Sequence, residues 1–172
     1  MANRIPSASQ PASLLDLANY HRDAEASLRL YFTSTNPDFI ALFAGDRPSE
    51  VAKKLADRIH ETDMRSALVV MAHVEAAFRL DYDWRRKAKK PDAVSIAFRR
   101  HRRTNVRLDE DIWETWKVNH PTARPLVSQL RSAFNFRHWL AHGRYGPAGQ
   151  KYDFQTLYIL AQAVLTAFPL CS

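Results

Sequence analysis

The chain has 172 residues and a formal net charge of +7, and 46% of the residues are hydrophobic, which is typical of one folded globular domain and excludes wholesale disorder. Only 4 glycines accompany 4 tryptophans, 6 tyrosines and 9 phenylalanines, and this balance disfavours a β-sandwich with many tight turns. The single cysteine, Cys171, excludes an internal disulfide and a zinc site built from several cysteines. No apolar run is long enough for a membrane span, and the N-terminus lacks the apolar stretch of a signal peptide. We therefore expect a cytoplasmic protein.

The N-terminal part of the chain predicts a loose arm followed by two helices. Residues 1–12 contain serine and proline without apolar periodicity, so we expect a flexible arm there. Leucine and alanine at helical spacing then predict a helix over residues 13–32. Asn36 and Pro37 together form a helix-start signal, which predicts a short helix at 38–44.

The middle of the chain predicts two helices separated by a break. A helix opens near residues 46–50, and the polar residues 61–63 predict an interruption after it. Residues 64–80 form the most apolar helical pattern in the chain, so we expect that helix at the centre of the fold.

Four further segments have helical periodicity, at residues 91–103, 108–116, 126–142 and 153–168. No alternating strand pattern of useful length stands out anywhere in the sequence. We therefore predict an all-α fold, a bundle of about six helices that forms a single domain over residues 13–172.

Positive charge is concentrated in the basic segment, which we define as residues 85–107. It contains ten lysines and arginines but only one acidic residue, Asp92. This excess is larger than solubility requires, so the segment predicts a surface that contacts RNA rather than a merely solvated face. We expect the RNA contacts to come from Arg85, Arg86, Lys87, Arg99, Arg100, Arg102 and Arg103, with Arg144 in addition.

Arginine and histidine side chains gather near the end of the 126–142 helix. Arg137 and His142 are five residues apart, about 140° around a helix, and the long arginine can swing toward the histidine where the helix ends. His138 and His142 are four residues apart and share a face. Arginine holds phosphate through a planar fork, and histidine can act as a base or an acid near neutral pH.

The window Arg137-His138-Trp139-Leu140-Ala141-His142 resembles the signature of the HEPN family of small helical proteins. That signature is an arginine, a polar residue, three further residues and a histidine at the end of a late helix. The stretch 72–79, which contains Glu75, resembles the family's core helix, which often carries a glutamate. The resemblance covers roughly residues 64–168 and implies a HEPN-like helical bundle.

Active HEPN domains are metal-independent ribonucleases, so the resemblance implies an endoribonuclease that needs no metal and no cofactor. It implies catalytic roles for Arg137, His142 and His138, with support from Glu75. Family members dimerise so that two motifs face one cleft, which implies a homodimer that cleaves RNA through attack by the 2′-hydroxyl. Toxins and antiphage defence effectors belong to this family.

The resemblance also implies an antitoxin or another regulatory protein as a partner. Toxins of the family that pair with a nucleotidyltransferase antitoxin often carry a tyrosine two residues after the histidine. Here Arg144 occupies that position and Tyr145 follows it, and this departure argues against regulation by such an antitoxin. Tyr145 is kept as a supporting residue.

Less specific interpretations compete with this one. Arg137 and His142 can simply cap the carbonyls at a helix end, and Glu75 can be a satisfied core residue. His138 and His142 can form half of a zinc site, but no third ligand has a recognisable spacing. In another functional class, the chain is a non-catalytic HEPN-like module that binds RNA, a nucleotide or a partner protein; a helical DNA-binding regulator is a third alternative.

Overall fold

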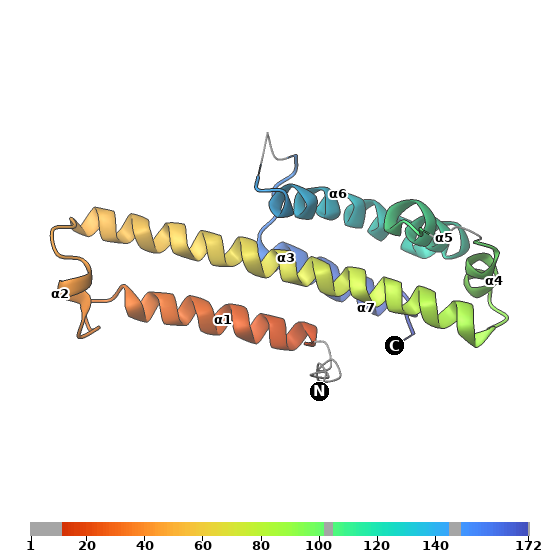
Figure 1. Ribbon diagram of the computed structural model, residues 1–172, viewed down its shortest axis with the longest axis horizontal. Coiled ribbons are helices and arrows are strands. Elements are labelled where there is room, and N and C mark those ends of the chain that lie inside the picture. The colour runs from red at the N-terminus through yellow and green to blue at the C-terminus, as the bar shows by residue number, and fades with distance from the viewer. Residues whose placement is uncertain (1–11, 102–104, 145–148, 172) are drawn as a thin grey trace, which may run out of the picture. The chain divides into compact units, whose positions relative to one another are not determined.

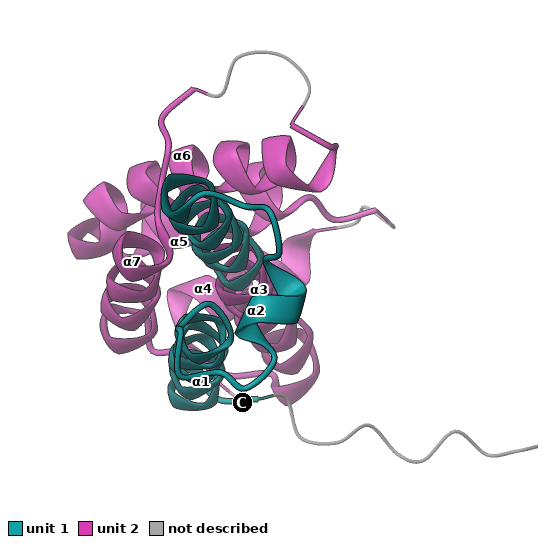
Figure 2. Cartoon of the chain, turned by 90° about the vertical axis from the view of Figure 1, so that its left-hand side faces the viewer, with its two compact units in different colours: residues 1–66 teal, residues 67–172 magenta. Residues whose placement is uncertain are grey.

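The computed structural model describes residues 12–101, 105–144 and 149–171. The regular elements in these ranges are all helices, which confirms the all-α prediction (Figure 1). They fall into two compact units, residues 1–66 and 67–172, where the sequence predicted a single domain (Figure 2). The arm predicted at residues 1–12 lies almost entirely outside the described ranges.

Unit 1 contains α1 (Leu14–Tyr31), α2 (Phe39–Leu42) and the first part of α3 (Pro48–Ala88). Ser13 caps α1, because its hydroxyl accepts from the Asp16 N–H at 3.1 Å and the Asp16 carboxylate accepts from the Ser13 N–H at 2.9 Å. These bounds agree with the helix predicted over 13–32.

The break predicted at residues 61–63 is wrong, because α3 runs without interruption through these positions. The Thr62 hydroxyl donates to the Arg58 carbonyl at 2.9 Å, so this polar side chain is satisfied along the helix. Glu61 forms an ion pair with Arg65 one turn later at 3.2 Å. Polar side chains with such partners do not end a helix that contains neither glycine nor proline here.

Unit 2 contains the rest of α3 and most of the buried core. Its further elements are α4 (Ala93–Arg100), the π-helical turn η1 (Leu108–Trp113), α5 (Glu114–Asn119), the 3₁₀ turn η2 (Pro121–Ala123), α6 (Arg124–Ala141) and α7 (Phe154–Ala167).

Aromatic side chains from four of these elements and from the tail meet in the core of unit 2. The Phe168 ring, just after α7, lies 5.1 Å from the Phe78 ring of α3 and 5.4 Å from the Trp116 ring of α5. The Trp113 ring of η1 lies 4.7 Å from the Phe134 ring of α6. Edge-to-face rings of this kind add to the burial that holds α3, α5, α6 and η1 together.

Candidate functional site

The end of α6 is set by Gly143. The Arg144 N–H donates to the Trp139 carbonyl at 2.9 Å and the Gly143 N–H donates to the Leu140 carbonyl at 3.4 Å, which is the hydrogen-bond pattern of a Schellman motif. This pattern requires a left-handed residue after the helix, and Gly143 supplies it with a φ of 78°. The last residue of the helix is Ala141, and the predicted histidine, His142, is its C-terminal cap.

Arg137 lies one and a half turns before this end and reaches toward α3. Its Nη2 lies 3.3 Å from Oε2 of Glu75, and its side chain is 32% exposed. The guanidinium carbon lies 5.9 Å from the centre of the Phe134 ring. Its Nε has no acceptor among the described residues. The guanidinium is thus held at one corner and has a donor left for an anion.

Glu75 binds two arginines rather than one. Its Oε1 accepts from Nε of Arg79 at 2.8 Å, and its Oε2 faces Arg137. Because one carboxylate contacts two arginines, its single negative charge orients Arg137 but does not neutralise both guanidinium groups. This matches the supporting role predicted for Glu75, although it equally satisfies the interpretation of Glu75 as a paired structural residue.

His138 and His142 are brought together by the helical repeat. Their ring centres are 4.1 Å apart and both residues are exposed. The backbone N–H of His142 donates to the His138 carbonyl at 3.0 Å, which fixes the spacing of the two residues. Two imidazoles at the surface can accept and donate protons.

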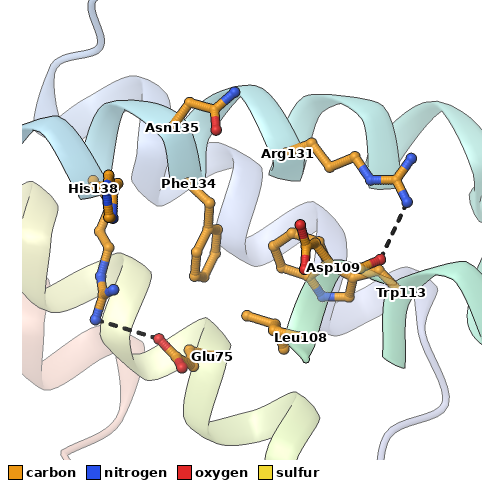
Figure 3. A pocket seen from close by; sticks show the side chains of 9 residues that line it. Glu75, Leu108, Asp109, Trp113, Arg131, Phe134, Asn135 and His138 are labelled. Atoms are coloured by element: carbon orange, nitrogen blue, oxygen red, sulfur yellow. Dashed lines mark hydrogen bonds and ion pairs between the residues drawn. The ribbon is translucent and has the colours of Figure 1, made fainter. Parts of the chain in front are cut away.

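A cavity of about 520 Å³ opens beside these residues, and we call it the α6 cavity (Figure 3). All of its lining residues belong to unit 2: Glu75, Leu108, Asp109, Trp113, Arg131, Phe134, Asn135, Arg137 and His138. Its volume falls within the roughly 300–1,000 Å³ of typical small-ligand sites. Three of the predicted site residues, Glu75, Arg137 and His138, therefore share one cavity, with His142 against His138.

No functional role was predicted from the sequence for the residues at the far end of the α6 cavity. Arg131 donates from Nη2 to the Asp109 carbonyl at 3.2 Å and to Oε2 of Glu114 at 2.7 Å, and the bond from Arg131 holds the pKa of Glu114 below its usual value. The signal was present, since residues 131, 134, 135 and 138 have the spacing of one helical face. No pattern in the sequence, however, indicates that η1 packs against this face of α6.

Arg85 does not occupy the position expected of an RNA-binding residue. Its side chain is only 5% exposed, and it donates to Asp81 at 2.7 Å, to Asp92 at 2.9 Å and to the Pro169 carbonyl at 2.6 Å. Burial raises the pKa of Asp81, while the Cys171 N–H and Arg85 act in the opposite direction. This placement contradicts an RNA contact through Arg85, because the guanidinium is occupied inside the fold.

The other predicted basic residues have different positions. Arg86, Lys87, Arg100 and Arg144 are exposed. Arg99 is half-buried and donates to the Lys90 carbonyl at 2.9 Å. Three predicted site residues lie outside the described ranges: Arg102, Arg103 and Tyr145.

Within the described ranges, no group of three histidine, cysteine, aspartate or glutamate side chains is arranged to hold a metal ion. None of the described helices has an apolar stretch long enough to cross a membrane. Comparisons with protein-family models, with curated proteins and with solved structures find no match to this chain.

Proposed function

We propose that this protein is a HEPN-type endoribonuclease that cleaves RNA without a metal ion. The observation that carries the proposal is the grouping of Arg137, His138 and His142 at the exposed end of α6, beside a cavity with aromatic walls. A toxin or an antiphage defence effector in the cytoplasm, with an antitoxin or another regulator as partner, is the biological role that such an enzyme would have.

The proposed reaction uses the 2′-hydroxyl of the RNA as the nucleophile. A base removes the 2′-hydroxyl proton, the oxygen attacks the adjacent phosphorus, and the bond from phosphorus to the 5′-oxygen breaks. An acid gives a proton to the departing 5′-oxygen. The products carry a 2′,3′-cyclic phosphate and a 5′-hydroxyl, and DNA is left intact because it has no 2′-hydroxyl.

The residues of the α6 end have the groups that this reaction needs. Arg137 binds the scissile phosphate and stabilises the charge that develops on it, with Glu75 holding one corner of the guanidinium. His142 is the general base or acid, and His138 assists it from 4.1 Å between ring centres.

One chain supplies one pair of Arg137 and His142, with His138 beside His142. A homodimer in which two α6 ends face one cleft would supply the second pair. The exposed residues Arg86, Lys87, Arg100 and Arg144 would then contribute to binding of the RNA backbone.

The test is cleavage of a single-stranded RNA in EDTA by the full chain and by variants. Arg137→Ala should slow cleavage roughly 100-fold or more, and His142→Ala by roughly 100- to 10,000-fold. Arg124→Ala, at the other end of α6, and His60→Ala, in unit 1, are exposed matched controls and should cleave at the unaltered rate.

Three results would contradict the proposal. The first is cleavage by both site variants at the rate of the unaltered chain, and the second is loss of cleavage in EDTA. The third is RNA binding without cleavage by the unaltered chain, which would instead support the non-catalytic binding module.

A further inference from the structure

The α6 cavity extends well beyond the groups that the proposed cleavage uses. Figure 3 shows Glu75 and His138 at one end of it and Arg131 with Asp109 at the other, with Phe134 between them. A scissile phosphate and its ribose would occupy only the end with Arg137 and His138. The rest of the cavity is available to another part of the same ligand.

The middle of the cavity is apolar and aromatic. Leu108 and Trp113 from η1 face Phe134 from α6, and the Phe134 ring is only half-buried (Figure 3). A phosphate-ribose backbone gains little from apolar walls, whereas a nucleobase has a flat face that stacks on an aromatic ring. The walls therefore fit a base.

Two polar groups flank this apolar surface. Oδ1 of Asp109 accepts from the Glu110 N–H at 2.9 Å and lies 3.7 Å from Nε of Arg107, whereas Oδ2 accepts no hydrogen bond within the described part of the chain. The indole N–H of Trp113 has no acceptor among the described residues, although Trp113 is 1% exposed. A buried donor without an acceptor is costly to a fold. Because Trp113 is almost fully buried, a ligand reaches the Asp109 carboxylate, whose side chain is 50% exposed, rather than this N–H.

We propose that the α6 cavity is a nucleobase subsite, which holds the base next to the scissile phosphate with its face on Phe134. This inference rests on the proposed function, because it assumes that RNA enters at Arg137. Oδ2 of Asp109 accepts hydrogen bonds from the pairing edge of the base, so adenine, cytosine and guanine, which have an amino group there, are preferred to uracil, which has only its N3–H.

The test measures binding of fluorescein-labelled hexanucleotides of adenosine, cytidine or uridine to the full chain carrying His142→Ala, which is expected to slow cleavage roughly 100- to 10,000-fold and so to preserve the RNA during the measurement. His142 does not line the α6 cavity, so the subsite stays intact. The adenosine and cytidine hexanucleotides should bind at least several-fold more tightly than the uridine hexanucleotide. Free AMP, CMP and UMP are tested as competitors in the same assay.

Two substitutions in the α6 cavity probe the subsite separately. Phe134→Leu keeps an apolar side chain but removes the stacking surface, and should weaken binding of the preferred hexanucleotides roughly 5- to 150-fold. Asp109→Asn should bring the ratio between the cytidine and uridine hexanucleotides toward one. Tyr158→Leu removes a half-buried aromatic ring of α7 outside the α6 cavity and should bind like its parent. Thermal melting monitors the folding of each variant.

The outcomes separate this subsite from the proposed nuclease. The subsite proposal is wrong if the three hexanucleotides bind equally well. It is also wrong if Phe134→Leu folds and binds them like its parent. Neither result would contradict RNA cleavage by the unaltered chain. Tight binding of a free nucleotide without binding of any hexanucleotide also overturns the subsite. Base-selective RNA binding that Phe134→Leu abolishes supports the subsite, even if the unaltered chain does not cleave RNA.

Discussion

Two arginines of unit 2 lie in opposite environments. Arg85 has its guanidinium enclosed by Asp81, Asp92 and the Pro169 carbonyl, while Arg137 has one carboxylate neighbour, Glu75 at 3.3 Å, and borders a cavity. A guanidinium with several internal acceptors stabilises the fold, whereas a guanidinium with a donor to spare can bind an anion. The role of each arginine follows from its partners rather than from its charge.

Removing Arg85 should therefore affect stability and not RNA binding. Arg85→Met leaves Asp81 buried without its cation, so we expect the free energy of unfolding to fall by about 3–5 kcal/mol. Urea denaturation followed by circular dichroism measures this loss.

Lys87→Met is the matched control for this change. Lys87 is exposed, so its loss should alter the free energy of unfolding by less than about 0.5 kcal/mol while weakening RNA binding. The assignment is wrong if Arg85→Met has the stability of the unaltered chain and a lower affinity for RNA.

The placement of Arg85 could not be predicted from the sequence. Its position in the basic segment predicts an RNA contact, but its guanidinium donates to Asp81 one turn away and to the Pro169 carbonyl 84 residues away. A contact of that separation is decided by how α3 and the end of the chain pack. By contrast, Arg137, His138 and His142 were predicted from the sequence because their relation depends on one helix and its end.

At the scale of elements, the end of α6 positions the proposed catalytic histidine. Gly143 has a φ of 78° and open space where a Cβ would lie, so only its backbone conformation resists substitution. Gly143→Ala should therefore lower the free energy of unfolding by about 1 kcal/mol and also reduce RNA cleavage, since His142 precedes this residue.

Gly149→Ala provides the comparison for this prediction. Gly149 also has open space around its Cβ position but not the left-handed backbone of Gly143, so the substitution should change stability by less than about 0.5 kcal/mol. Equal urea midpoints and equal cleavage rates for the two variants would show that the turn after α6 does not depend on Gly143.

Most helices could be predicted from the sequence because they carry local signals. Asp153 caps α7 through a 2.7 Å hydrogen bond from the Thr156 N–H, and the predicted apolar stripe of that helix is buried. The π-helical turn η1 could not be predicted, because residues 108–113 read as an ordinary helix start. That turn brings Trp113 and Asp109 to the α6 cavity. Because the turn could not be predicted, the residues at this end of the cavity could not be predicted as neighbours either.

At the scale of the whole molecule, the single predicted domain is divided into two compact units that share α3. The continuous helix explains why the sequence predicts no boundary, since neither glycine nor proline interrupts residues 49–88. The candidate site nevertheless lies in unit 2 alone. The proposed chemistry of the site therefore requires no residue of unit 1.

The most direct measurement of the central claim compares one RNA with the same sequence carrying a 2′-O-methyl group on every ribose, both incubated with the full chain in EDTA. We predict that the RNA is cleaved to fragments with 2′,3′-cyclic phosphate and 5′-hydroxyl ends, and that the methylated strand competes for binding but stays intact, because its 2′-oxygen cannot lose a proton. Cleavage of the methylated strand, or RNA fragments with 5′-phosphate ends, would contradict attack by the 2′-hydroxyl and with it the proposed roles of Arg137 and His142.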